Sequence, residues 1–231
     1  LGGAEAGMYS AFYKLSLVLT LFVQAFRFAA EPFFFGKSND KDAPETYALV
    51  MRYFVYVSGG IFLVTMICIP WLAPLVLQKP LYYENARGLK IVPVLLLANL
   101  CLGIYYNLSI WYKLSGKTQM GGLIALFGAI VTIFGNFIFS PKFGFVASAY
   151  TTLGAYATLV VLGYWFGQKY YPIPYPLGII FLILILAILP IVVLPTVFPM
   201  IHHAYYWALL PLYLGVVFAI EKRLSRTPLN Q

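Results

Sequence analysis

Apolar runs long enough to cross a membrane recur along the whole chain. A bilayer's hydrocarbon core is about 30 Å thick, which about 20 helical residues span. We expect seven such helices and hence an all-α, polytopic transmembrane bundle. The predicted spans are residues 8–35, 47–77, 90–113, 121–139, 145–166, 177–198 and 205–220. The second contains Pro70 and Pro74, so it either tilts or ends near Pro70 with an interfacial piece beyond.

Short polar connections separate these runs. We expect loops at residues 36–40, 115–118 and 140–144, where Gly, Ser, Asn, Asp and Pro gather. The Pro-rich segment 171–176 cannot continue a helix. We therefore divide the chain into residues 1–168, with five spans, and residues 169–231, with two further spans and a tail.

The first run carries a polar stripe through an otherwise apolar helix. Its members recur every three or four residues, and at about 100° per residue they fall within roughly 80° of one face. They are Tyr9, Tyr13, Ser16, Thr20, Gln24, Arg27 and Glu31. At about 1.5 Å per residue the stripe is roughly 33 Å long. It requires a hydrated path or a second polar helix as its partner, because lipid is a poor one.

Composition agrees with a membrane protein. Hydrophobic residues make up 62% of the chain and charged residues only 10%, and the mean hydropathy is +0.86. The formal charge of +8 lies mostly at span ends, where it meets anionic head groups, so no nucleic-acid partner is expected. Cys68 and Cys101 both lie inside spans, which indicates neither a disulfide framework nor a metal site, and no cofactor is expected.

The basic residues also give an orientation. Seven spans place eight Lys or Arg residues on one side, namely Lys37, Lys41, Lys113, Lys117, Lys169, Lys222, Arg223 and Arg226. The other side receives four, namely Lys79, Arg87, Lys90 and Lys142. Cytoplasmic loops carry the excess of positive charge, so we expect the C-terminus in the cytoplasm and Leu1 outside.

Arg27 is the main candidate for binding. A guanidinium presents a planar fork of donors that suits phosphate, while Gln24 and Thr20 could offer hydrogen bonds to sugars. The alternative is an intrahelical ion pair between Arg27 and Glu31 near the cytoplasmic interface.

Four further residues are candidates. Lys14 lies about 120° from the centre of the stripe and would extend to the interface. Arg52 would either anchor the second span or form a basic pocket with Arg27. Tyr106 and Asn107 in the third span would line a sugar path or hydrogen-bond to neighbouring helices.

Other chemistry has little support in the sequence. The segment Gly116-Lys117-Thr118 resembles the end of a P-loop, but the first glycine of that motif would fall at Trp111. All seven acidic residues lie at or near span ends. This weakens any proposal of a proton-coupled carboxylate or a catalytic acid within the membrane.

Three stretches together resemble a known family. They are GMYSAFYKLS at 7–16 with FRFAAEPFFF at 26–35, LGIYYNLSIWYK at 102–113, and Asn136 with PKFG at 141–144, ASAYTTL at 147–153 and Tyr156. This pattern resembles the polysaccharide-biosynthesis (Wzx-type) flippases of the multidrug/oligosaccharidyl-lipid/polysaccharide exporter superfamily, whose fold is MATE-like. The last two spans resemble the family only in hydropathy.

The resemblance implies fourteen helices in two lobes around a cationic cavity, to which Arg27, Arg52 and Lys14 would contribute. Members move undecaprenyl-diphosphate-linked oligosaccharides across the bacterial inner membrane. By position, this chain would be helices eight to fourteen, that is, one lobe plus two extra helices, without the N-terminal lobe and helix seven. The start at Leu1 agrees with that assignment. Alone, such a chain would lack the opposing lobe needed for alternating access.

We therefore expect part of a flippase for lipopolysaccharide, O-antigen or related glycans, a transporter and not an enzyme. Its partners would be the lipid-linked glycan, membrane lipids and the missing lobe. One alternative is a cation-coupled multidrug exporter of the same superfamily, which would carry an intramembrane acid. Another is an integral-membrane glycan polymerase or acyltransferase, which would need a catalytic constellation beside a large loop. A third is a scaffolding domain whose polar stripe is satisfied by neighbouring helices.

Overall fold

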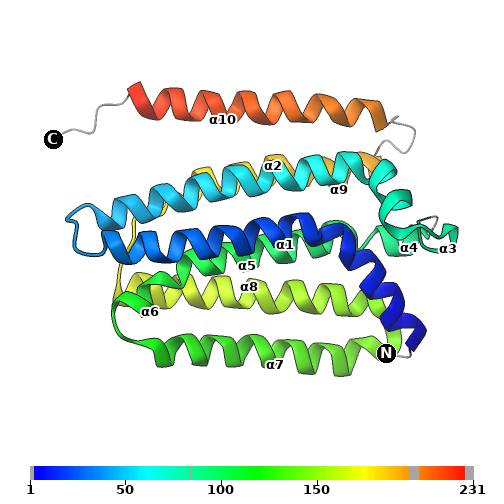
Figure 1. Ribbon diagram of the computed structural model, residues 1–231, viewed down its shortest axis with the longest axis horizontal. Coiled ribbons are helices and arrows are strands. Elements are labelled where there is room, and N and C mark those ends of the chain that lie inside the picture. Colours follow the sequence, from blue (N-terminus) through cyan, green and yellow to red (C-terminus); the bar gives the residue numbers. More distant parts are fainter. Residues whose placement is uncertain (1–2, 84, 198–202, 227–231) are drawn as a thin grey trace.

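A computed structural model describes residues 3–83, 85–197 and 203–226, and all regular elements there are helices (Figure 1). The long helices are α1 (Gly3–Lys37), α2 (Ala43–Leu77), α5 (Val92–Leu108), α7 (Thr118–Phe143), α8 (Phe145–Tyr170), α9 (Leu177–Val197) and α10 (Leu209–Arg226). The short ones are α3 (Pro80–Tyr83), α4 (Ala86–Leu89), α6 (Ile110–Leu114) and the 3₁₀ helix η1 (His203–Ala208).

Among the described residues, five helical segments are long and apolar enough to cross a membrane, and they coincide with the first five predicted spans. They are Glu5–Lys37, Ala43–Leu77, Arg87–Leu114, Thr118–Phe143 and Phe145–Tyr170. The sixth predicted span matches α9, in which the apolar segment Leu177–Ile191 is shorter than the other five. The predicted end of this span, Phe198, lies outside the described residues. The seventh matches α10, which ends in Glu221, Lys222, Arg223 and Arg226. Seven crossings therefore stay a prediction.

The long helices run side by side as a slab. In Figure 1, α7 lies at one edge, followed by α8, then α1 and α5, then α2 and α9, with α10 at the other edge. One end of the slab contains four parts of the chain, namely the turn after α1, the turn before α7, the end of α8 and the end of α10. That end carries the eight basic residues that were grouped by sequence, and the four others lie at the opposite end.

Helices pass through proline at two places. The loop predicted at 140–144 is wrong, because α7 continues through Pro141 to Phe143 and only Gly144 separates it from α8. Gly144 has φ 62° and ψ −143°, a conformation that only glycine adopts without strain. Helix α2 likewise passes Pro70 and Pro74 and ends at Leu77, where the N–H of Gln78 donates to the Pro74 carbonyl at 3.1 Å.

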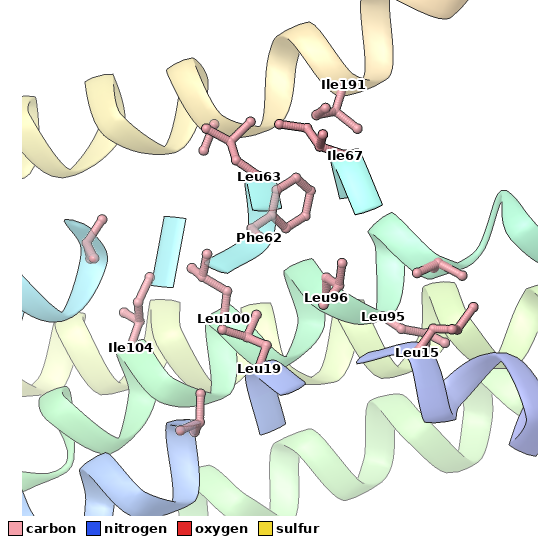
Figure 2. Close-up of a cluster of buried hydrophobic side chains, with 14 of the residues drawn as sticks. Leu15, Leu19, Phe62, Leu63, Ile67, Leu95, Leu96, Leu100, Ile104 and Ile191 are labelled. Atoms are coloured by element: carbon pink, nitrogen blue, oxygen red, sulfur yellow. The ribbon is translucent and has the colours of Figure 1, made fainter. Parts of the chain in front are cut away.

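The central core joins α1, α2, α5 and α9. Figure 2 shows Leu15 and Leu19 of α1 near Leu95, Leu96 and Leu100 of α5. On the other side of α5, Figure 2 also shows side chains of α2 and α9 converging, namely Phe62, Leu63, Ile67 and Ile191. Within a bilayer such packing stabilises by van der Waals contact, because lipid chains are as apolar as leucine.

Glycines bring α7 against α8 and α6. A methyl group added at Gly128 would come within 2.8 Å of Leu159, and one at Gly135 within 2.5 Å of Thr151. At Gly121 it would meet Tyr112 at 2.7 Å. These three glycines are seven residues apart, so they form one ridge along α7. By contrast, Gly122 has nothing within 4 Å, so three of these four glycines allow close packing.

We expect Gly128→Leu to destabilise the protein by about 1–3 kcal/mol, because the new side chain must displace Leu159. The measurement is the midpoint of heat-induced unfolding of the purified full-length protein in detergent. The matched control is Gly122→Leu, which places the same side chain on an open face of the same helix and should leave the midpoint unchanged. Equal effects of the two substitutions would show that α7 does not rely on this glycine ridge.

Candidate functional site

The predicted polar stripe forms one continuous flank of α1. The neighbouring face of α1 is buried through Phe12, Leu15, Leu19 and Val23, which holds the helix against the core. Of the stripe residues only Ser16 is fully buried, and the others are half-buried. The stripe therefore lies beside the contact of α1 with α5 and α8 and is partly open.

Hydroxyl groups gather at the end of the stripe nearest the start of α8. The hydroxyls of Tyr9 and Thr152 of α8 are 3.4 Å apart, and the rings of Tyr9 and Tyr13 stack with centroids 6.0 Å apart. The hydroxyl of Tyr156 lies near enough to those of Tyr9, Tyr13 and Tyr106 to interact electrostatically. Three helices thus contribute tyrosines to one region.

The middle of the stripe is used in packing. The Ser16 hydroxyl donates to the Tyr13 carbonyl at 2.7 Å and accepts from the Asn99 amide of α5 at 3.4 Å. The Thr20 hydroxyl donates to the Ser16 carbonyl at 3.3 Å. The Gln24 amide makes no hydrogen bond to any other residue that the structure describes. Of these side chains, Gln24 is the one left to bind another molecule.

Arg27, Glu31 and Lys113 form a charged cluster at the lysine-rich end. Lys113 of α6 donates to Glu31 at 2.6 Å, whereas the Arg27 Nε lies 3.9 Å from the second Glu31 oxygen. The expected intrahelical pair is therefore the longer of two contacts to Glu31. The guanidinium of Arg27 lies 4.6 Å above the centre of the Tyr106 ring, a cation–π contact that orients it.

The cluster carries one net positive charge and is open to the outside. The Arg27 side chain is 42% exposed, and that of Lys113 is 21% exposed. A small hollow lies between the charged cluster and the side chains of Phe26, Phe34 and Ile110. Its volume is only about 10 Å³, roughly the room for one water. A larger anion would therefore bind on this surface, not inside an enclosed pocket of these helices.

Arg52 lies on another contact of α2. Its Nε is 3.1 Å from a carboxylate oxygen of Glu221 in α10, and the hydroxyls of Tyr53 and Tyr56 donate to the same carboxylate at 3.1 and 3.0 Å. Near it, the Tyr213 hydroxyl donates to the Tyr56 carbonyl at 2.6 Å. Arg52 does not line the hollow beside Arg27. Its contacts dock α10 on α2.

The remaining predicted residues are also separate from the charged cluster. Lys14 is exposed and belongs to no ion pair within the described ranges. Asn107 is 2% exposed and donates to the Gly103 carbonyl at 3.1 Å. In this conformation Asn107 does not reach a molecule on the surface, and its role in binding stays a prediction.

Sequence reasoning did not include Lys113, Thr152 or Tyr156 among the candidate residues. A signal existed for Lys113, because it lies seven residues after Tyr106 and shares its helical face. No such signal linked Thr152 and Tyr156 to α1, since Thr152 lies 143 residues after Tyr9 in the chain and Tyr156 lies farther still. Among the described residues, no three His, Cys, Asp or Glu side chains cluster as metal ligands would.

Comparison of the chain with protein-family models, curated proteins and solved structures gave no match. The interpretation of the site therefore depends on the residues and contacts described above.

We expect Arg52→Gln and Glu221→Gln each to destabilise the protein by about 1–3 kcal/mol, because each leaves a charged partner without its counterion. The double variant should lose little more than the worse single one, since both remove the same contact. Thermal unfolding of the full-length protein in detergent measures all three. Additive losses would show that the two residues do not act as a pair.

Proposed function

We propose that this chain is part of a membrane flippase that moves undecaprenyl-diphosphate-linked oligosaccharides across the bacterial inner membrane. In this proposal α1, α5 and α8 form one wall of the cargo path. The chain contributes one MATE-like lobe and two extra helices, and the opposing wall belongs to an N-terminal lobe. Transport proceeds by conformational change, without covalent chemistry in the protein.

The observation that carries the proposal is the state of Arg27. Its guanidinium is held over Tyr106, makes only a long contact to Glu31 and remains 42% exposed near the end of an apolar helix. A charge on a spanning helix costs free energy, so it is rare there without a partner or a function. The diphosphate of a lipid-linked sugar is an anion of the chemistry that a guanidinium recognises.

The neighbouring side chains suit the rest of such a cargo. Lys113 adds a second cation beside Arg27, and Gln24 follows one turn along the stripe with an amide that can bind sugar hydroxyls. The tyrosines Tyr9, Tyr13, Tyr106 and Tyr156 offer apolar ring faces and polar hydroxyls in one region. Charge and sugar-binding groups therefore follow one another along a single flank.

The cation-coupled exporter has less support. A coupling carboxylate must be able to bind and release a cation. The two carboxylates on the long helices beyond their first turns, Glu31 and Glu221, are both held by cationic side chains in the part of the chain that the structure describes.

We expect Arg27→Ala in the full-length protein to reduce surface glycan about tenfold or more in the source bacterium, because a charged hydrogen bond contributes about 1.5–3 kcal/mol. Arg27→Lys should retain part of the activity, since it keeps the charge but loses the fork. The control is Lys37→Ala on the same helix, whose ammonium pairs with Asp40 outside the stripe. Surface glycan and membrane protein level are measured together.

Normal glycan at normal abundance would remove Arg27 from the mechanism. Loss of glycan together with loss of the protein would assign Arg27 to folding instead.

The proposed orientation has its own test. In a variant without Cys68 and Cys101, we expect Lys142→Cys to react with a membrane-impermeant thiol reagent in cells with a permeabilised outer membrane. Lys117→Cys should react only after the inner membrane is opened, because the lysine-rich end would lie in the cytoplasm. Both side chains are exposed in the structure. The reverse labelling pattern would invert the topology.

A further inference from the structure

A long apolar groove lies on one side of the contact between α7 and α8. Its volume is about 520 Å³, and its lining is Val131, Gly135, Phe139, Phe143, Val146, Ala147, Tyr150, Thr151 and Gly154. A second hollow of about 240 Å³ shares Phe143, Val146 and Tyr150 with it and adds Arg87, Lys90 and Ile91. The shared residues make the two hollows one continuous groove that ends at two cations.

Small residues form the floor of the groove and aromatic residues its sides. A methyl group at Gly154 would lie 3.8 Å from Val131, so the floor is open but close to the opposite helix. The sides are exposed, with Phe143 at 54% and Tyr150 at 58%. The groove therefore takes a slender apolar chain, and its open side allows entry from the bilayer.

The length of the groove matches one leaflet. Val131 and Phe143 are twelve residues apart on α7, which is about 18 Å along the helix. Half of a bilayer's hydrocarbon core is about 15 Å. An acyl chain in the groove would thus extend from the membrane interface to about the middle of the bilayer.

Arg87 and Lys90 form the basic end of the groove. The Arg87 guanidinium donates to the Phe143 carbonyl at 2.7 Å and lies 5.5 Å from the centre of the Phe145 ring, which fixes it at the mouth of the groove. Lys90 is exposed beside it. Neither cation belongs to an ion pair within residues 3–83, 85–197 and 203–226. Arg and Lys side chains that lie near each other at a membrane interface attract anionic head groups.

Glu5 is a carboxylate near this end, and it lines a neighbouring hollow together with Arg87 and Lys142. Its carboxylate accepts from the backbone N–H of Phe145 at 2.7 Å, which caps the start of α8. The groove is also distinct from the polar stripe, because Thr152, the partner of Tyr9, lies about 160° around α8 from Tyr150.

We propose that this groove binds an anionic phospholipid of the bilayer, with one acyl chain between α7 and α8 and the phosphate on Arg87 and Lys90. The occupant is a resident lipid and not the transported cargo, so the inference does not depend on the proposed function. The charge at the groove mouth favours phosphatidylglycerol-type head groups over zwitterionic ones. Because it binds the folded state, the lipid would stabilise the packing of α7 on α8.

The test uses the full-length protein in detergent with added dioleoyl-phosphatidylglycerol or dioleoyl-phosphatidylcholine, and native mass spectrometry to count bound lipids. We expect wild-type protein to bind phosphatidylglycerol at least tenfold more tightly than phosphatidylcholine. Arg87→Gln with Lys90→Gln should abolish that preference. The matched control is Lys142→Gln, which removes one charge at the same end of α7 but outside the groove and should keep the preference.

A second pair of variants tests the acyl chain. Gly154→Leu fills the floor of the groove and should weaken binding of both lipids at least tenfold, whereas Gly122→Leu, on the open face of α7, should not. If the double variant fails to fold, Lys90→Gln alone should still reduce the preference, because Lys90 makes no hydrogen bond or ion pair to another described residue.

Three results would overturn the proposal. One is an equal loss of preference in Lys142→Gln, which would indicate general charge attraction. Another is unchanged lipid binding in Gly154→Leu. The third is a dimer that Gly154→Leu dissociates, which would assign the groove to a second copy of the chain.

Discussion

The organising constraint in this protein is that a polar group within a membrane must find its partner inside the protein. Several polar side chains on the long helices meet this constraint across helix contacts, and others, such as Thr132, Thr151 and Thr158, bond to a carbonyl one turn back in their own helix. Asn99 reaches Ser16, the Trp111 indole donates to the Gly163 carbonyl at 3.1 Å, and Asn136 accepts from Ser148 at 2.7 Å. These bonds fix which helices are neighbours, since each would be costly to leave unmade in hydrocarbon. The partly free groups Arg27 and Gln24 are informative because they depart from this pattern.

Helical periodicity was enough to predict which residues share a face, but not what that face meets. The stripe from Tyr9 to Glu31 lies on one flank of α1, as its spacing indicated. The counterions were out of reach of such reasoning. Glu31 pairs with a lysine 82 residues away, and Arg52 with a glutamate 169 residues away. Pairings at that distance depend on how the helices are arranged, which hydropathy does not encode.

The same limit explains the errors at helix ends. Proline indicated a loop at 140–144, yet Pro141 lies within the last turn of α7, and the chain reverses at Gly144 alone. Local propensity is a weak guide where two helices pack closely on both sides of the turn. Arginines in different surroundings also look alike in sequence. Arg27 and Arg52 both lie near the lysine-rich end, but the Arg27 side chain is open to the outside, whereas Arg52 pairs with Glu221 of α10.

The single-residue connection at Gly144 also restricts how the molecule can move. One residue separates α7 and α8, Asn136 of α7 is bound to Ser148 of α8, and glycines of α7 lie against Leu159 and Thr151. These contacts oppose sliding of one helix on the other. We therefore expect a change of shape in this protein to be taken up outside this hairpin, for example at the break between α5 and α6 or in the proline-rich segment 171–176.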